Sequence, residues 1–122
     1  METNTNTPYT TELHLITVAK NEYATSLDER GFKPVFEYEI NGQPILWDRE
    51  TRDVFLTGIW KALGYTKVDV IKTIQCNPNV KTKKLRGGLL KIQGTWVPYQ
   101  DARSLCLRAA WIIRHQLTPL FG

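Results

Sequence analysis

A dense group of cations between residues 81 and 93 contains the side chains best suited to chemistry with a polyanion. The cations are Lys81, Lys83, Lys84, Arg86 and Lys91, and the uncharged Gln93 ends the segment. Ammonium and guanidinium groups neutralise phosphates, and a guanidinium fork or a glutamine amide also reaches the edges of bases. The group therefore predicts contact with nucleic acid, in which Arg86 is the best candidate for reading base edges. A solvated basic loop without a partner is the alternative.

The distribution of charge along the chain favours the first interpretation. Residues 1–60 carry 5 Lys and Arg against 10 Asp and Glu, whereas residues 61–122 carry 11 against 2. The formal net charge of +4 for the 122 residues hides this asymmetry. A strongly basic half is typical of chains that meet nucleic acid or an anionic membrane surface.

The residue types and their spacing give little support for catalysis or metal binding. His14, His115, Cys76 and Cys106 lack the spacing of metal ligands, and the two cysteines are expected to be free thiols. The sequence contains no nucleophile elbow, H-E-x-x-H motif, Walker motif or dinucleotide glycine motif. We therefore expect a protein that is not an enzyme and has no metal, no cofactor and no small-molecule substrate.

Length and composition predict one globular domain. With 42% hydrophobic residues, the chain has enough apolar material for a core. It has no apolar run of about 18 residues, so we expect no membrane partner, and it begins without the pattern of a secretory signal. Residues 1–11, rich in Thr and Asn, are predicted to be a disordered lead, and residues 12–122 form the predicted domain.

The elements that would position the cations begin with a small antiparallel sheet. Residues 34–40 alternate with period two, which predicts a strand with Glu37 and Glu39 facing solvent. Asn41-Gly42 predicts a two-residue turn into a partner strand over residues 43–47.

Three further segments give weaker signals for the sheet. Residues 54–56 are a third short strand candidate. Residues 12–19 fit a strand and a helix start equally well, and residues 21–30 fit a short helix or an irregular connection.

Two helices are predicted after this sheet. Thr57 can cap the first, which runs to Leu63 and stops at Gly64, and Thr66 can cap the second. In the second helix three apolar residues at spacings of three are expected to face the core: Val68, Ile71 and Ile74. The break at residues 77–79 contains Pro78.

A basic hairpin with Gly87-Gly88 at its tip follows the helix pair, and a last apolar helix is predicted from Pro98 to about Leu117, ended by Pro119. Two helices with a short glycine-bearing turn form a helix-turn-helix, and the hairpin would be its wing. The fold class predicted is α+β, a winged helix-turn-helix on a small antiparallel β-sheet. Thr66, Lys67 and Lys72 of the second helix are predicted to contact DNA together with the hairpin cations and Gln93.

The tryptophans are expected to serve the core. Trp60, Trp96 and Trp111 each lie in an apolar periodic stretch, which favours packing over stacking on single strands. Trp96 is predicted to pack beneath the hairpin against the C-terminal helices, with Trp60 and Phe121 as neighbours.

Three blocks of the sequence together resemble the fungal APSES DNA-binding domain, which is related to the KilA-N domain. They are residues 56–62, residues 86–98 with their Gln93-Gly94-Thr95-Trp96-Val97-Pro98 core, and residues 117–121. The resemblance covers about residues 34–122 and is strongest to the branch of stress-induced transcriptional repressors. It implies a nuclear, sequence-specific binder of double-stranded DNA that acts as one copy per site.

The resemblance also implies roles for particular residues. The second helix and the wing would approach the DNA, Gln93 would help to read it, and the target would be a short CG-containing motif. This chain differs from the cell-cycle members at Arg86, where they have a glutamine, and at Leu90 and Ile92, where they have a glycine and an aromatic residue. The second helix also has fewer arginines. A protein-interaction module of the same fold is the rival interpretation.

Overall fold

The computed structural model describes residues 16–122. The predicted lead over residues 1–11, and residues 12–15 of the segment from 12 to 19, therefore lie outside the described residues. The strands are β1 (Ala19–Ala24), β2 (Phe32–Ile40), β3 (Gln43–Asp48), β4 (Val54–Phe55), β5 (Lys83–Leu85) and β6 (Gly94–Val97). The helices are α2 (Leu56–Ala62), α3 (Lys67–Gln75), α4 (Tyr99–Ala109) and α5 (Thr118–Phe121), with 3₁₀ turns η1 (Leu90–Ile92) and η2 (Trp111–Ile113).

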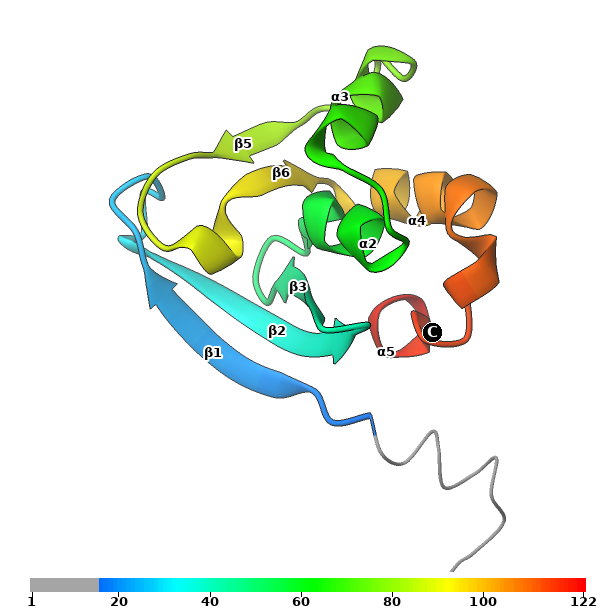
Figure 1. The fold of residues 1–122 in the computed structure, drawn as a ribbon. Helices are drawn as coiled ribbons and strands as arrows, with labels where there is room; N and C mark the ends of the chain where they lie inside the picture. Colours follow the sequence, from blue (N-terminus) through cyan, green and yellow to red (C-terminus); the bar gives the residue numbers. More distant parts are fainter. Residues whose placement is uncertain (1–15) are drawn as a thin grey trace, which may run out of the picture.

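The strands form one antiparallel sheet in the order β1-β2-β3-β4-β6-β5. The curved sheet lies to the left in Figure 1 and the helices to the right, with α3 and β5 at the top. Helix α2 follows β4 without a loop, and the chain from α2 through α3 returns to the sheet as β5. The predicted α+β architecture is confirmed, with a helix pair inserted between two neighbouring parts of one sheet.

The sheet separates two apolar clusters. On the helix side the core contains Ile45, Val54, Ile59 and Trp60 together with residues of α4 and α5. On the other side a smaller cluster holds five residues, which are Val35, Leu46, Phe55, Ile92 and Trp96. Side chains of a strand alternate between faces, so neighbouring residues of β4 supply one cluster each.

The turn between β2 and β3 is the one that the sequence predicts. Asn41 and Gly42 have φ angles of 52° and 75°, the left-handed values that a two-residue hairpin turn requires at both positions. Residue pairs Ile40–Gln43 through Val35–Asp48 then follow in register.

Two predictions about this part of the sheet are wrong at particular residues. Residues 21–30 were expected to form a short helix or an irregular connection, which is confirmed for residues 25–30, but Asn21 to Ala24 belong to β1 and pair with β2. Glu37 was expected to face solvent with Glu39, but only Glu39 does, because β1 and the β5–β6 hairpin cover Glu37 to 7% exposure. The side chains of Asn21, Tyr23 and Lys91 bind its carboxylate.

The predicted cap of the first helix is also wrong. Helix α2 begins at Leu56 after Phe55 and has no side-chain cap. The Thr57 hydroxyl instead accepts a hydrogen bond of 2.9 Å from the backbone N–H of Thr95 in β6. Gly94 makes this approach possible, because a Cβ there would lie 2.6 Å from the Thr57 hydroxyl.

The C-terminal segment is less regular than predicted. Helix α4 ends at Ala109, and η2 and α5 follow in place of a continuous helix to Leu117. Pro119 lies in the first turn of α5, where a missing N–H costs nothing. Trp111 is 55% exposed, so its assignment to the core is wrong, whereas Trp60 and Trp96 are each 1% exposed and confirm theirs.

Candidate nucleic-acid interface

Helix α3 is held at its start by the residues that the sequence indicates. The Thr66 backbone N–H donates to the Asp69 carboxylate at 2.7 Å, and the Thr66 hydroxyl accepts from the Asp69 N–H. This reciprocal pair is a capping box, and it satisfies two of the free donors at a helix start. The hydrogen bonds from the Thr66 backbone and hydroxyl hold the pKa of Asp69 below its usual range.

The outward face of α3 is not the one predicted. Val68 and Ile71 were expected in the core but are 56% and 46% exposed, and Val70 is the buried residue of the helix. Thr73 also points inward, where its hydroxyl accepts a hydrogen bond of 3.0 Å from the Trp60 indole. Ile74, the third residue expected to face the core, is partly buried against it, as predicted. The helix therefore turns Val70, Thr73 and Ile74 inward. It presents Val68 and Ile71 to solvent.

The hairpin of β5 and β6 is confirmed, but its connection is longer than a Gly-Gly turn. Leu85 pairs with Gly94, so residues 86–93 form the connection, which we call the hairpin loop. Gly87 and Gly88 have φ angles of 75° and 74°, which L side chains rarely adopt. The loop then makes the 3₁₀ turn η1 before it enters β6.

A groove of about 320 Å³ lies between α3 and the hairpin. It brings together four of the nine residues predicted to contact DNA, which are Lys67, Lys84, Arg86 and Gln93. The remaining lining residues are Val70, Ile71, Leu85, Gly94 and Thr95. No carboxylate lines the groove. The hairpin side carries two cations and the amide of Gln93, and it faces the apolar Val70 and Ile71 of α3.

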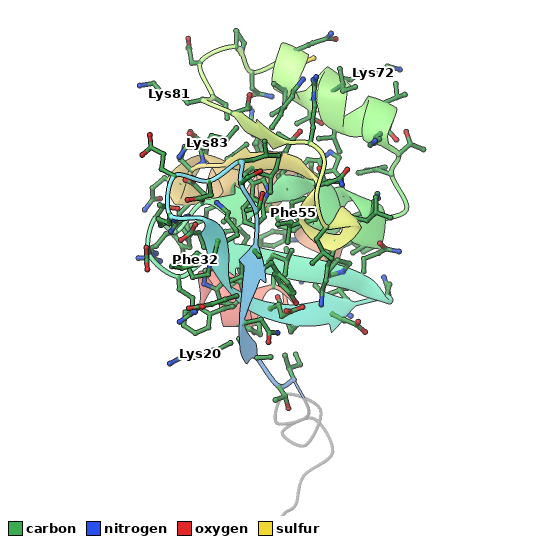
Figure 2. All side chains as sticks on the ribbon, turned by 90° about the vertical axis from the view of Figure 1, so that its left-hand side faces the viewer. Lys20, Phe32, Phe55, Lys72, Lys81 and Lys83 are labelled. Carbon is green, nitrogen blue, oxygen red and sulfur yellow. The ribbon has the colours of Figure 1, made fainter. Side chains whose placement is uncertain are left out.

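Four predicted cations lie outside this groove: Lys72, Lys81, Lys83 and Lys91. Lys81 and Lys83 are drawn at one margin of Figure 2 and Lys72 at the opposite margin. Lys72 lines a different depression, between α3 and α4. Lys83 makes an ion pair of 3.1 Å with Asp53, although its side chain remains 73% exposed.

Lys91 is used by the fold. Its ammonium lies 2.5 Å from the Glu37 carboxylate and 5.3 Å from the centre of the Tyr23 ring. Burial lowers the pKa of Lys91, but the hydrogen bonds to Glu37 and Tyr23 outweigh this effect and raise it. Burial likewise raises the pKa of Glu37, and its donors, Lys91 first, bring the pKa below the usual value. The ion pair fastens the hairpin loop to β1 and β2.

Gln93 has a second role that the sequence did not reveal. Its side-chain amide donates to the Gly88 carbonyl oxygen at 2.9 Å and so bridges the hairpin loop. Trp96 is buried as predicted, but its neighbours are Phe55 and Ile92 rather than Trp60 and Phe121. Its indole donates to the Ile92 carbonyl oxygen at 3.0 Å.

Other kinds of site are not apparent in the part of the chain that the structure describes. No three His, Cys, Asp or Glu side chains gather there as metal ligands would. Cys76 and Cys106 are free thiols, as predicted, and burial raises the pKa of Cys106 to about 12. Among residues 16–122 no helix has the length and apolar character needed to span a membrane.

Comparison with known proteins gives relatives in both sequence and structure. No family model matches the chain. The transcriptional repressor XBP1 of Saccharomyces cerevisiae is 50% identical over 54 residues, which are 44% of this chain and 8% of the repressor. The chain thus spans less than a tenth of the length of this curated relative.

Two solved structures share the fold. MBP1 from Saccharomyces cerevisiae superposes with a TM-score of 0.69 at 25% identity, over 85% of this chain and 98% of the other. PCG2, solved as a DNA complex, gives a TM-score of 0.63 at 26% identity, over 84% and 88%. The resemblance of this chain to the APSES-type DNA-binding domains of transcription regulators is therefore confirmed in both sequence and fold.

Proposed function

We propose that this chain is a sequence-specific binding domain for double-stranded DNA, part of a transcription factor that acts in the nucleus as a repressor. The repressor role rests on the similarity to XBP1, and DNA as the ligand rests on the similarity to the PCG2 domain solved with DNA. A short CG-containing target and binding of one copy per site are part of the proposal. Catalysis has no part in it.

The observation that carries the proposal is the groove between α3 and the hairpin. Two separate elements supply cations to it, Lys67 from α3 and Lys84 and Arg86 from the hairpin. None of the ion pairs among the described residues involves these three side chains. Their charges remain available for phosphates, which are the main source of affinity for DNA.

The two walls of the groove suggest a division of labour. Arg86 has the fork that suits guanine edges, whereas Lys67 and Lys84 supply point charges that suit phosphates. Thr66 directly precedes Lys67, the α3 residue that lines the groove, and the exposed Lys72, Lys81 and Lys83 add positive charge elsewhere on α3 and the hairpin side of the molecule. Lys91 contributes by holding the hairpin loop in place, since Glu37 already occupies its ammonium.

The decisive experiment is selection of duplexes from a random pool, followed by titration of the selected site at several salt concentrations. If about 6 of the cations meet phosphates, affinity falls by about a thousandfold between roughly 50 and 200 mM salt. A protein-interaction module would enrich no sequence and show a nearly flat salt dependence. That result would overturn the proposal.

Single substitutions separate reading from positioning. Arg86→Ala should cost about 1–3 kcal/mol on the selected site and less on random duplex, whereas Lys67→Ala or Lys84→Ala should weaken both alike. Lys20→Ala is the matched control, because Lys20 is an exposed lysine of β1 at the opposite end of the molecule (Figure 2). Equal losses on both duplexes for Arg86→Ala would assign Arg86 to phosphate contact.

A further inference from the structure

The tip of the hairpin loop presents a large apolar side chain that the fold leaves in solvent. Leu90 is 82% exposed, and its neighbour Leu89 is 46% exposed. A single exposed leucine is common on protein surfaces. This one, however, stands on the same loop as Arg86 and Gln93, so its surroundings decide whether it has a use.

The turn that carries Leu90 is fixed on both sides. Ile92, the last residue of η1, is fully buried against Trp96, whose indole binds the Ile92 carbonyl. The Ile92 N–H donates to the Leu89 carbonyl oxygen at 3.2 Å, and the Gln93 N–H donates to the Leu90 carbonyl oxygen at 3.1 Å.

The neighbouring side chains are fixed as well. Lys91 is held by Glu37, and the Gln93 amide holds the Gly88 carbonyl. Of the three residues of η1, Leu90 alone therefore points outward without a partner among the described residues. Lys91 and Ile92, which follow it, are both held by the contacts described above.

The residues that precede the two leucines on the hairpin are small or basic. Gly87 and Gly88 add no side-chain bulk. Arg86 and Lys84 come just before them and line the groove, in which no carboxylate is found. Small residues beside Leu90 and cations earlier on the same hairpin suit a duplex groove, where phosphates flank the stacked bases.

We propose that Leu90 is an apolar wedge, which enters the minor groove of the bound duplex, inserts between two stacked base pairs and bends the DNA. This inference rests on the proposed function. Leucine is among the side chains that act in this way, and the cost of unstacking is recovered through the extra contacts of a bent duplex. Pyrimidine–purine steps kink most easily, so the selected sites should contain one where the tip lands.

The test uses the 122-residue chain and its selected duplex in two labelled forms. A fluorescent adenine analogue beside the expected step brightens when the step is unstacked, and a donor–acceptor pair at the two ends reports the bend. The variants are Leu90→Ala and the conservative Leu90→Met. Leu107→Ala serves as control, because Leu107 is an exposed leucine too, at 47%, but lies on α4, beside a different depression.

Leu90→Ala should abolish both signals and weaken binding to the selected duplex about tenfold, with an unchanged melting temperature of the protein. Leu90→Met and Leu107→Ala should retain the signals. If Leu90→Ala binds and bends the duplex as the wild type does, the wedge is overturned while the proposed function stands. If the wild type selects no duplex at all, the proposed function itself fails.

Discussion

Lys33 in β2 and Lys84 in β5 are the same side chain in two opposite environments. Lys33 is 5% exposed, with its ammonium 3.0 Å from the Asp48 carboxylate and 4.3 Å from the centre of the Trp96 ring. Lys84 is exposed on the wall of the groove and has no ion pair among the described residues. The first lysine therefore serves the fold, and the second remains available to a ligand.

The same contrast extends to the acidic residues. Arg30 binds three carboxylates near the ends of β2 and β3, those of Asp28, Asp48 and Glu50, at 2.6 to 2.9 Å. Much of the acidic charge of the first half is thus used within the molecule. The acidic first half and basic second half of the sequence thus have different roles in the fold. In the sheet, charges are largely paired with one another, whereas on α3 and the hairpin positive charges face solvent.

Removing the centre of the internal network should have the largest effect. Asp48 is fully buried and binds Arg30, Lys33 and the backbone N–H groups of Glu50 and Thr51. Asp48→Asn leaves the buried Lys33 ammonium without its carboxylate and removes one of the three carboxylates of Arg30, which should lower the free energy of unfolding by about 3–5 kcal/mol in urea denaturation. Glu50→Gln removes an exposed member of the network and should cost at most about 1 kcal/mol. Similar losses for both variants would contradict the contrast.

Acid should weaken the sheet through the same carboxylates. The hydrogen bonds from Arg30 hold the pKa of Asp28 at about 2. Burial raises the pKa of Asp48, but its donors, Arg30 first, hold it well below the usual range. Because both folded values lie below the unfolded value of about 3.9, the stabilisation is complete above about pH 5 and is lost as the pH falls toward 2.

For Asp28 alone the loss is on the order of 2 kcal/mol, measurable from urea midpoints at a series of pH values. The Asp48→Asn variant should show a shallower dependence on pH than the wild type, since it lacks one of the titrating groups. An unchanged slope would show that other carboxylates govern acid unfolding.

Loss of the α3 cap should have a smaller effect. Thr66→Ala removes the hydroxyl that accepts from the Asp69 N–H, and such caps contribute about 1 kcal/mol. Thr66→Ser keeps an acceptor and should retain most of the stability.

Because α3 buries only Val70 fully, amide hydrogen exchange in α3 should rise before exchange in α2, whose residues are almost all buried. Simultaneous loss of protection in both helices would mean that they unfold as one unit.

The smallest change in stability is expected at the groove. Lys84→Ala should alter the free energy of unfolding by no more than about 0.5 kcal/mol, as for most exposed positions, while it weakens DNA binding. Lys33→Ala, the matched change in the sheet, should destabilise the protein. If Lys84→Ala lowered the melting temperature as much as Lys33→Ala does, the groove lysine would have a structural role.

The features that the sequence predicted correctly are local ones. Asn41-Gly42 determines its own turn, and the Thr66–Asp69 capping box lies within four residues. The β5–β6 hairpin was also found, because its glycines mark a turn between two strands, although the apolar run after them forms η1 and the strand begins only at Gly94. The site residues on α3 and the hairpin follow from these elements, although only the fold shows that four of them share a groove.

The features that were missed depend on partners distant in sequence. Strand β1 is polar and exposed, and only its pairing with β2 identifies it as a strand. Glu37 has the alternation of a surface residue, but Lys91, far along the chain, covers and neutralises it. In α3 a stripe three residues apart suggested a core face through Val68 and Ile71, whereas contact with Trp60 selects the neighbouring face through Val70 and Thr73.

The two buried indoles connect the fold to each wall of the groove separately. The N–H of Trp60 donates to Thr73 of α3, and the N–H of Trp96 donates to Ile92 of the hairpin loop. Each indole proton gives its own resonance in a nitrogen–proton NMR spectrum, at a frequency set by that hydrogen bond. The protein therefore carries two intrinsic probes, one for the helix and one for the loop, which allow the order in which the two walls engage a ligand to be followed without any added label.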